Sequence, residues 1–282
     1  MNINQDKHFI TLLDHSVSKE SFSLFLDENL ALLATVPQPS ADQLPKYYES
    51  DDYISHTDGK RTLFEKAYHF VKGIALKQKT KLILKYQNRG ALLDLGAGTG
   101  DFLNAAKAEG WQVTGVEPSE KAREIAAGKN LTLYPDTANL PDHSFDVITM
   151  WHVLEHVPDV NSQIITLKRL LKPGGTIVVA VPNYKSYDAN YYGEYWAAYD
   201  VPRHLWHFSR TAIEKLFGSH GMVLKDVLPM KFDAFYVALL SEKYQAGKMN
   251  YFKAFRIGLR SNAKAAKTGE YSSLIYILQN KS

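Results

Sequence analysis

The segment 91-ALLDLGAGTGD-101 joins a short apolar run to a stretch with helical spacing, residues 101–109. The run ALLDL is typical of a buried β-strand. The glycines that follow it let the backbone turn sharply and approach a ligand with no Cβ in the way. Ligands of open α/β sheets bind at the carboxyl ends of the strands. A ligand-binding loop is therefore predicted here, with a tight turn that binds nothing as the alternative.

Downstream of this loop, short apolar runs alternate with helical segments. The runs are rich in β-branched residues and occupy 112–116, 131–134, 145–150 and 176–181, and the helical segments occupy 119–127 and 162–171. This alternation predicts βαβ units and a parallel sheet. A helix at 211–220, a strand at 222–228 and a last strand at 274–279 are expected to follow, with inserted helices at about 229–271.

Upstream of the loop, two apolar runs flank a turn-like Asp27-Glu28-Asn29, which predicts a small hairpin over residues 22–36. Pro37 and Pro39 end it, and an aromatic arm follows. Residues 61–87 have helical spacing with few helix breakers and are expected to form one helix.

The acids around the loop indicate which ligand it binds. A dinucleotide fingerprint would place its third glycine where this chain has Asp101, and Asp94 lies just before the loop. Two carboxylates would repel a pyrophosphate, whereas S-adenosylmethionine (SAM) carries a sulfonium and an ammonium group that carboxylates attract. Glu117, at the end of the next strand, can accept hydrogen bonds from ribose hydroxyls in either kind of site, or can be a surface acid.

Five motifs then occur in an order that resembles the class I SAM-dependent methyltransferases, in particular the ubiquinone-type and polysaccharide-associated branch. They are LLDLGAGTGDFL, VTGVEPSE, NLPDHSFDVITMWHVLEHVPD, LKRLLKPGGTIVVAVPN and PRHLWHFSRTAIEKLFGSHGM. The resemblance covers about residues 60–228. It implies a Rossmann-like, doubly wound α/β fold with a mostly parallel seven-stranded sheet and an antiparallel last strand.

The resemblance also implies which residues hold SAM. Those beside the methionine moiety are Asp94, Gly96, Ala97, Gly98 and Gly100. Glu117 would hold the ribose and Pro118 would lie beside the adenine, with Asp136, Thr137 and Ala138 at the adenine edge. Trp151 and His152 would lie near the reacting methyl group, with a plain core aromatic as the alternative for Trp151.

The N-terminal segment resembles relatives in which cysteines form a small metal knuckle. Leu26 and Asn29 stand where those cysteines are expected, so residues 1–59 are interpreted as a hairpin without its metal, followed by a lid arm that carries Tyr53 and His56. Residues 60–282 would then form the methyltransferase domain, with a substrate insert at about 183–209 and a helical insert at about 229–271.

Methyl transfer needs a base only when the acceptor must lose a proton. His152 and His204 are the candidate bases. His152 and His156 lie four residues apart, a spacing that can bind zinc, but the sequence shows no third ligand. No metal is therefore expected, and Glu155-His156 is interpreted as structural.

The predicted insert is dense in aromatic residues and lies where an acceptor pocket is expected. The candidate substrate-binding residues are Tyr195, Trp196, Tyr199, Arg203 and His207. Arg203 is a candidate partner for an anionic acceptor. Alternatively, the rings only pack the insert.

The composition limits the classes of protein. The net charge of +3 argues against a general nucleic-acid binder, and the absence of cysteine excludes disulfides and thiolate catalysis. No signal peptide and no transmembrane segment are predicted, so a cytoplasmic location is expected. A basic helix over residues 248–267 is either a solvated face or a contact for an anionic carrier, lipid or RNA.

Together these observations predict a SAM-dependent methyltransferase that acts on an O or N atom of a small molecule, such as a sugar, a glycan precursor or a quinol-like acceptor. The alternatives are a SAM-binding protein without transferase activity and an RNA-directed methyltransferase. A nicotinamide-dependent oxidoreductase is disfavoured by Asp101 and by the order of the motifs.

Overall fold

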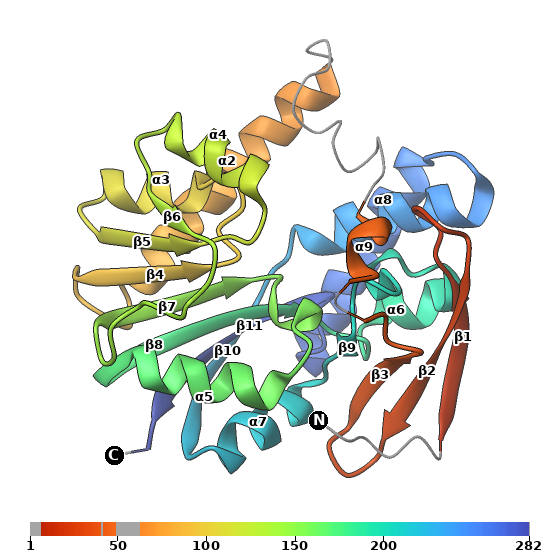
Figure 1. Ribbon diagram of the computed structural model, residues 1–282. Coiled ribbons are helices and arrows are strands. Elements are labelled where there is room, and N and C mark those ends of the chain that lie inside the picture. Colours follow the sequence, from red (N-terminus) through yellow and green to blue (C-terminus); the bar gives the residue numbers. More distant parts are fainter. Residues whose placement is uncertain (1–6, 41, 49–62, 282) are drawn as a thin grey trace.

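A computed structural model describes residues 7–40, 42–48 and 63–281, and within them the largest element is a seven-stranded sheet (Figure 1). Its strands lie in the order β10-β11-β8-β7-β4-β5-β6. Their bounds are β4 (Ala91–Leu95), β5 (Gln112–Val116), β6 (Leu133–Tyr134), β7 (Phe145–Trp151), β8 (Leu171–Pro182), β10 (Met222–Pro229) and β11 (Ser273–Asn280).

The strand directions confirm the predicted doubly wound topology. Parallel pairing joins β4 to β5, β5 to β6, β4 to β7 and β7 to β8, whereas β11 runs antiparallel to both of its neighbours. The chain proceeds outward from β4 to β6 and then returns to form β7 on the other side of β4. The strand order therefore reverses between β4 and β7, and the carboxyl ends of these two neighbouring strands form the switch point at which such sheets bind ligands.

Side-chain alternation buries both faces of this sheet. On one face, Leu93, Ile148 and Val179 pack with the helices α5 (Val160–Leu170) and α7 (Arg210–Ser219). On the other face, Leu92, Val147 and Val178 pack with α3 (Asp101–Ala108) and the end of α2 (Leu63–Ile83). Consecutive strand residues thus enter opposite cores, which explains why the strands are continuous apolar runs.

A second sheet of four strands lies beside the first (Figure 1). It consists of β1 (His8–Leu13), β2 (Ser21–Asp27), β3 (Leu32–Val36) and the two-residue β9 (Trp206–His207). β3 pairs with β9 through Leu33 opposite His207 and Ala34 opposite Trp206. The N-terminal strands are therefore completed by a strand from the segment that follows β8.

The remaining elements cover this second sheet and one end of the first. The segment after β8 forms α6 (Tyr187–Tyr192) and the short helices η3 (Gly193–Tyr195) and η4 (Ala197–Tyr199), and the chain later forms α8 (Asp233–Ala246) and α9 (Tyr251–Thr268). The other helices are η1 (Leu44–Tyr47), η2 (Leu154–His156) and α4 (Glu120–Ala127). A separate core joins β2, α6 and α8 through residues such as Leu24, Tyr192 and Ala238.

The sequence predicted most of these elements but not the full N-terminal sheet. Strands were expected at 91–95 and 112–116, where they occur, and helices were expected at 211–220 and within 229–271, where α7, α8 and α9 lie. The prediction of a hairpin over 22–36 omitted β1 and β9. The prediction of a strand over 131–134 was too long, because only Leu133 and Tyr134 pair with β5.

Candidate functional site

The glycine loop between β4 and α3 adopts a backbone that requires glycine. Gly96, Gly98 and Gly100 have φ values of +67°, +54° and +77°, a region that disfavours side chains with a Cβ. A Cβ at Gly96 would lie 2.4 Å from Val153 Cγ2, whereas a Cβ at Gly98 would meet nothing within 4 Å. Gly98 therefore presents bare backbone to open space, as a cradle for a ligand does.

Asp94 lies beneath this loop and is almost fully buried. Its Oδ1 accepts a hydrogen bond from Thr149 Oγ1 at 2.6 Å. Burial raises the pKa of the Asp94 carboxyl to about 7, although the Thr149 hydrogen bond and the charge of Lys79 act in the opposite direction. A carboxylate held in this way has strong affinity for a cationic group brought next to it.

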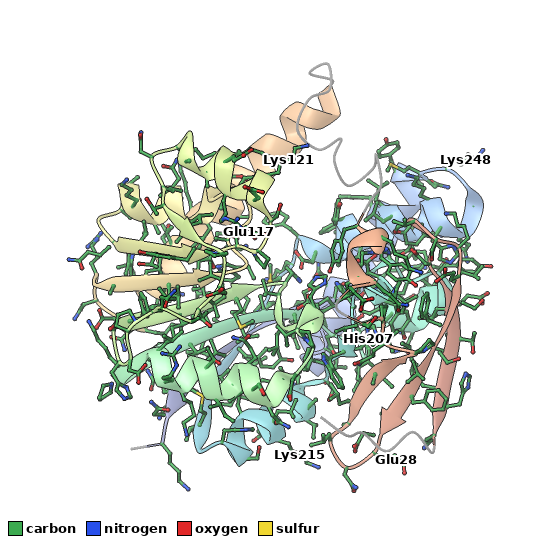
Figure 2. All side chains as sticks on the ribbon, in the orientation of Figure 1. Glu28, Glu117, Lys121, His207, Lys215 and Lys248 are labelled. Atoms are coloured by element: carbon green, nitrogen blue, oxygen red, sulfur yellow. The ribbon has the colours of Figure 1, made fainter. Side chains whose placement is uncertain are left out.

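Glu117 connects the loop to the end of β5. Its Oε2 accepts a hydrogen bond from Gly98 N at 2.8 Å, and its Oε1 accepts one from Ser119 N at 2.9 Å. Glu117 N donates to Tyr134 O at 2.9 Å, so the end of β6 lies alongside. Figure 2 places Glu117 at the ends of the strands, on the side that faces the second sheet.

The other expected adenine-side residues continue from these strand ends. Pro118 is exposed next to Glu117, and Asp136 follows β6 by two residues. Asp136 Oδ1 accepts a hydrogen bond from Ala138 N at 2.8 Å, which fixes the turn that contains Thr137. The structure therefore gathers the predicted cofactor residues along one edge of the sheet.

A pocket of about 230 Å³ opens beside the loop. It is lined by Ala75, Leu76, Lys79, Asp94, Gly96, Ala97, Thr99, Asp101, Phe102 and Trp151. Lys79 Nζ lies 4.2 Å from the centre of the Trp151 ring. The pocket thus offers a buried carboxylate on one side and an ammonium group on the other, which suits the zwitterionic end of an amino acid. These residues fit SAM.

Asp101 departs from its predicted role. Asp101 was expected to act with Asp94 as a counter-charge for the ligand. Instead, Lys129 Nζ contacts Asp101 Oδ1 at 2.6 Å and Thr99 O at 2.7 Å. The charge of Asp101 is therefore largely balanced within the protein, and Asp94 is the carboxylate that remains for a cation.

His152 follows β7 and is held between two acids. Its Nε2 lies 3.0 Å from Asp233 Oδ2, and its Nδ1 lies 3.4 Å from Glu155 Oε1. Burial alone would disfavour the imidazolium, but Asp233 and Glu155 outweigh it and raise the pKa of His152 to about 10. An imidazolium cannot accept a proton, so His152 is a candidate base only for a state in which this pairing is broken.

A larger cavity of about 710 Å³ adjoins the first pocket. Ala75 and Lys79 line both. The walls of the larger cavity are mainly apolar, with Leu82, Met230 and Phe235 among them, and Asp233 faces it from the start of α8. An apolar space that continues from the carboxyl ends of the parallel strands is suited to a small, largely apolar second ligand.

The expected substrate residues of the aromatic insert are mostly buried. Trp196, Tyr199 and His207 are each less than 5% exposed. Trp196 Nε1 donates to Asp188 Oδ2 at 2.8 Å, and Thr35 Oγ1 lies 3.1 Å from His207 Nε2. These contacts favour the alternative that the rings pack the insert. Tyr195 is half-buried and packs against His15.

Arg203 also differs from its prediction. It is 1% exposed, and its guanidinium contacts Asp14 Oδ1 at 2.9 Å, Asp200 Oδ1 at 2.7 Å and Tyr47 O at 2.9 Å. With its donors already used inside the protein, Arg203 fixes the N-terminal sheet to the insert. This corrects the expectation that it pairs with an anionic acceptor.

Sequence reasoning missed two residues of this region. Lys79 lies on a long helix with no motif, and Asp233 reaches His152 from 81 positions along the chain. Glu155, which was interpreted as structural, is a buried carboxylate beside His152. A sequence gives no signal for such contacts, because each depends on how distant elements pack.

Comparisons with known proteins agree with this geometry. A family model described as a methyltransferase domain matches residues 68–225, which is more than half of the 282-residue chain. A ubiquinone biosynthesis O-methyltransferase from Vibrio cholerae is 36% identical over 108 residues, which are 34% of this chain and 44% of that protein. The chain thus spans less than half the length of the first curated relatives it matches.

Two solved structures share the fold at low sequence identity. Phospholethanolamine N-methyltransferase 2 from Haemonchus contortus, in complex with phosphomonomethylethanolamine and S-adenosylhomocysteine, has a TM-score of 0.54 at 16% identity. The alignment covers 89% of this chain and 63% of that chain. Geranyl diphosphate C-methyltransferase from Streptomyces coelicolor has a TM-score of 0.55 at 11% identity, with 86% of this chain and 99% of that chain covered.

Proposed function

This chain belongs to the methyltransferase domain family, and we propose that it transfers a methyl group from SAM to an O or N atom of a small, largely apolar acceptor. The observation that carries the proposal is the pocket in which the buried carboxylate of Asp94 lies beside the glycine-loop residues Gly96 and Ala97. Relatives named as ubiquinone biosynthesis O-methyltransferases support the same class of reaction.

The pocket residues divide the binding of SAM between them. Asp94 faces the ammonium and sulfonium end, and Lys79 pairs with the carboxylate of the methionine moiety. Glu117 accepts hydrogen bonds from the ribose, and Pro118 with residues 136–138 borders the adenine. Trp151, packed edge-on against Phe102 with ring centres 5.4 Å apart, forms the apolar wall near the methyl group.

When bound, SAM supplies an already activated methyl group, which moves in line to the acceptor atom. The chain then contributes mainly position and exclusion of water. We place the acceptor in the 710 Å³ cavity, because it continues from the SAM pocket past Ala75 and Lys79. Its apolar walls favour a quinol-like acceptor over a sugar. The ion pair between the imidazolium of His152 and Asp233 would fix the wall of the larger cavity that Asp233 lines.

The first test measures cofactor binding. Isothermal titration should detect SAM and S-adenosylhomocysteine but not NAD. The variant Lys79→Met should weaken S-adenosylhomocysteine binding about tenfold, because a charge-assisted hydrogen bond is lost. Lys77→Met, on the exposed face of the same helix, is the matched control and should bind as the wild type does.

Two results would reject parts of the proposal. If the protein ignores both SAM and S-adenosylhomocysteine at millimolar concentration, the cofactor assignment fails. If it binds them but labelled SAM gives no methylated product with quinols, glycan precursors or RNA, the chain is a SAM-binding protein without transferase activity.

We further propose that α9 brings the protein to an anionic lipid surface. One face of α9 packs on α8 through Ala254, Ile257 and Ser261. The apolar surface of α9, defined as Tyr251, Phe252, Phe255 and Leu259, is instead 49–79% exposed. Exposed bases flank it, among them Arg256, Arg260 and Lys267. Large apolar side chains, including the aliphatic Leu259, between basic side chains are typical of a helix that lies in the surface of an anionic membrane.

Within the described residues no helix combines the length and the apolarity needed to cross a bilayer. The cytoplasmic location stays a prediction.

A further inference from the structure

A cluster of three potential metal ligands lies where η2 meets the segment before β9. Glu155, His156 and His204 each offer one ligand atom, and these atoms lie within 4.8 Å of one another. Leu205 N donates to Glu155 O at 2.8 Å, so the two segments are held together by their backbones. The cluster differs from the pair His152 and His156 that the sequence suggested, because it contains Glu155 in place of His152 and takes His204 from 48 positions beyond His156.

Both histidine rings are fixed by backbone carbonyls. His156 Nδ1 lies 3.0 Å from Arg203 O, and His204 Nδ1 lies 2.9 Å from Ala198 O. A carbonyl oxygen only accepts hydrogen bonds, so each Nδ1 carries a proton, and in the neutral ring the lone pair is then on Nε2. A backbone carbonyl that fixes the opposite nitrogen is the usual support for a histidine ligand. The rings lie edge to face, with centres 4.6 Å apart.

Glu155 lacks the partners that a buried carboxylate needs. It is 1% exposed, and neither Oε1 nor Oε2 accepts a hydrogen bond from any described residue. Its ion-pair partner is His152, whose Nδ1 lies 3.4 Å from Glu155 Oε1. The same imidazolium also pairs with Asp233, at the shorter distance of 3.0 Å between Nε2 and Oδ2. A buried carboxylate without hydrogen bonds is costly unless it is paired or coordinates a metal.

The surroundings also carry several carboxylates. Asp14 and Asp200 share the guanidinium of Arg203, and Glu155 and Asp233 share the imidazolium of His152. Lys79 also acts on Asp233, so Glu155 is the carboxylate of the second group with the weaker pairing. A divalent cation at Glu155 would offset its charge.

We propose that Glu155, His156 and His204 bind one divalent transition-metal ion of the zinc type. Two imidazole nitrogens and one carboxylate oxygen form a ligand set that zinc accepts, with a fourth position left for an oxygen ligand, either water or the acceptor. The site lies three residues beyond Val153, which packs against Gly96 of the glycine loop. It is therefore close to the SAM pocket but shares none of its lining residues. The proposal goes beyond the proposed function and does not depend on it.

The test is metal binding by the full chain after treatment with EDTA. Titration with Co²⁺ should produce the visible absorption of a four- or five-coordinate site at one equivalent, and Zn²⁺ should displace it. Glu155→Gln and His204→Asn should each weaken Co²⁺ binding at least tenfold. His220→Gln, which alters a surface histidine at the end of α7, is the matched control and should leave binding unchanged.

A second measurement covers the case in which a variant does not fold. In the wild type, one equivalent of Zn²⁺ should shift the imidazole ¹⁵N resonances of His156 and His204, but not those of His220, in NMR spectra. The proposal is overturned if the wild type binds neither ion stoichiometrically at micromolar concentration, if folded Glu155→Gln binds as the wild type does, or if Zn²⁺ shifts the resonances of neither His156 nor His204. S-adenosylhomocysteine binding, measured separately, reports on the proposed function alone.

Discussion

At the residue scale, the titration of Asp94 gives a pH dependence for cofactor binding. Its folded pKa of about 7 lies above the ordinary value of 3.8, so the group gains its charge only as the pH rises through neutrality. Between about pH 6 and about pH 7.5 the ionised fraction rises roughly eightfold. The affinity for S-adenosylhomocysteine, measured by titration calorimetry, should rise by about the same factor, because the carboxylate rather than the acid attracts the ammonium group.

The control for this prediction is Asp94→Asn, which keeps the shape and the contact with Thr149. It should bind S-adenosylhomocysteine about tenfold more weakly at neutral pH and show a flat profile over the same range. A wild-type affinity that falls as the pH rises would contradict the assignment of Asp94.

Single residues were predictable where their role is local. The glycines of the loop were identified because a strand, a turn and a helix in succession demand their backbone angles, and those angles are observed. For Trp196 the sequence left open whether the ring binds a ligand or packs the insert, and the role of Arg203 was not predicted, because burial depends on distant partners such as Asp188 and Asp14. An aromatic or a guanidinium in a sequence carries no sign of whether its partner is a ligand or another part of the chain.

At the scale of elements, Arg203 joins the N-terminal sheet to the insert after β8. Arg203→Met should lower the free energy of unfolding by about 3–5 kcal/mol, because it leaves Asp14 and Asp200 buried without a counter-charge. Urea denaturation followed by circular dichroism measures this. Arg210→Met is the matched control, since Arg210 is partly exposed and lies 4.0 Å from Glu270, and it should cost less than about 1 kcal/mol. Equal losses in the two variants would argue against the role of Arg203.

Secondary-structure elements with a strong local pattern were predicted well. The buried strands of the large sheet are continuous apolar runs, and the helices between them have one apolar face. Both patterns can be recognised within a short stretch of sequence. β9 has only two residues, and it exists because β3 offers it an edge. No local pattern can specify a strand of that length, because its hydrogen bonds come from the partner.

At the scale of the whole molecule, α8 and α9 form one outer corner, and Figure 2 places Lys248 at its tip, away from Glu117. If this corner meets lipid, vesicles that contain phosphatidylglycerol should bind the protein, and binding should weaken as salt rises. Phe252→Ser with Phe255→Ser should reduce vesicle binding at least tenfold in a sedimentation assay, because two exposed rings no longer enter the bilayer surface.

Ile165→Ser is the matched control for that pair, since Ile165 is 58% exposed on α5. It should leave vesicle binding unchanged. Undiminished binding by the double variant would exclude the apolar surface of α9, and salt-sensitive binding of single-stranded RNA in place of vesicles would assign the bases to nucleic acid.

The pairing of β3 with β9 has a consequence for how the protein is made. During synthesis the first three strands leave the ribosome about 170 residues before Trp206 and His207 do, and they expose the edge of β3 throughout that time. The N-terminal sheet therefore matures only after the central sheet has largely emerged. If the chain is divided near residue 59, the N-terminal fragment keeps the unpaired edge of β3, and the C-terminal fragment keeps β9 without its partner strand. We therefore expect both fragments to aggregate when expressed alone.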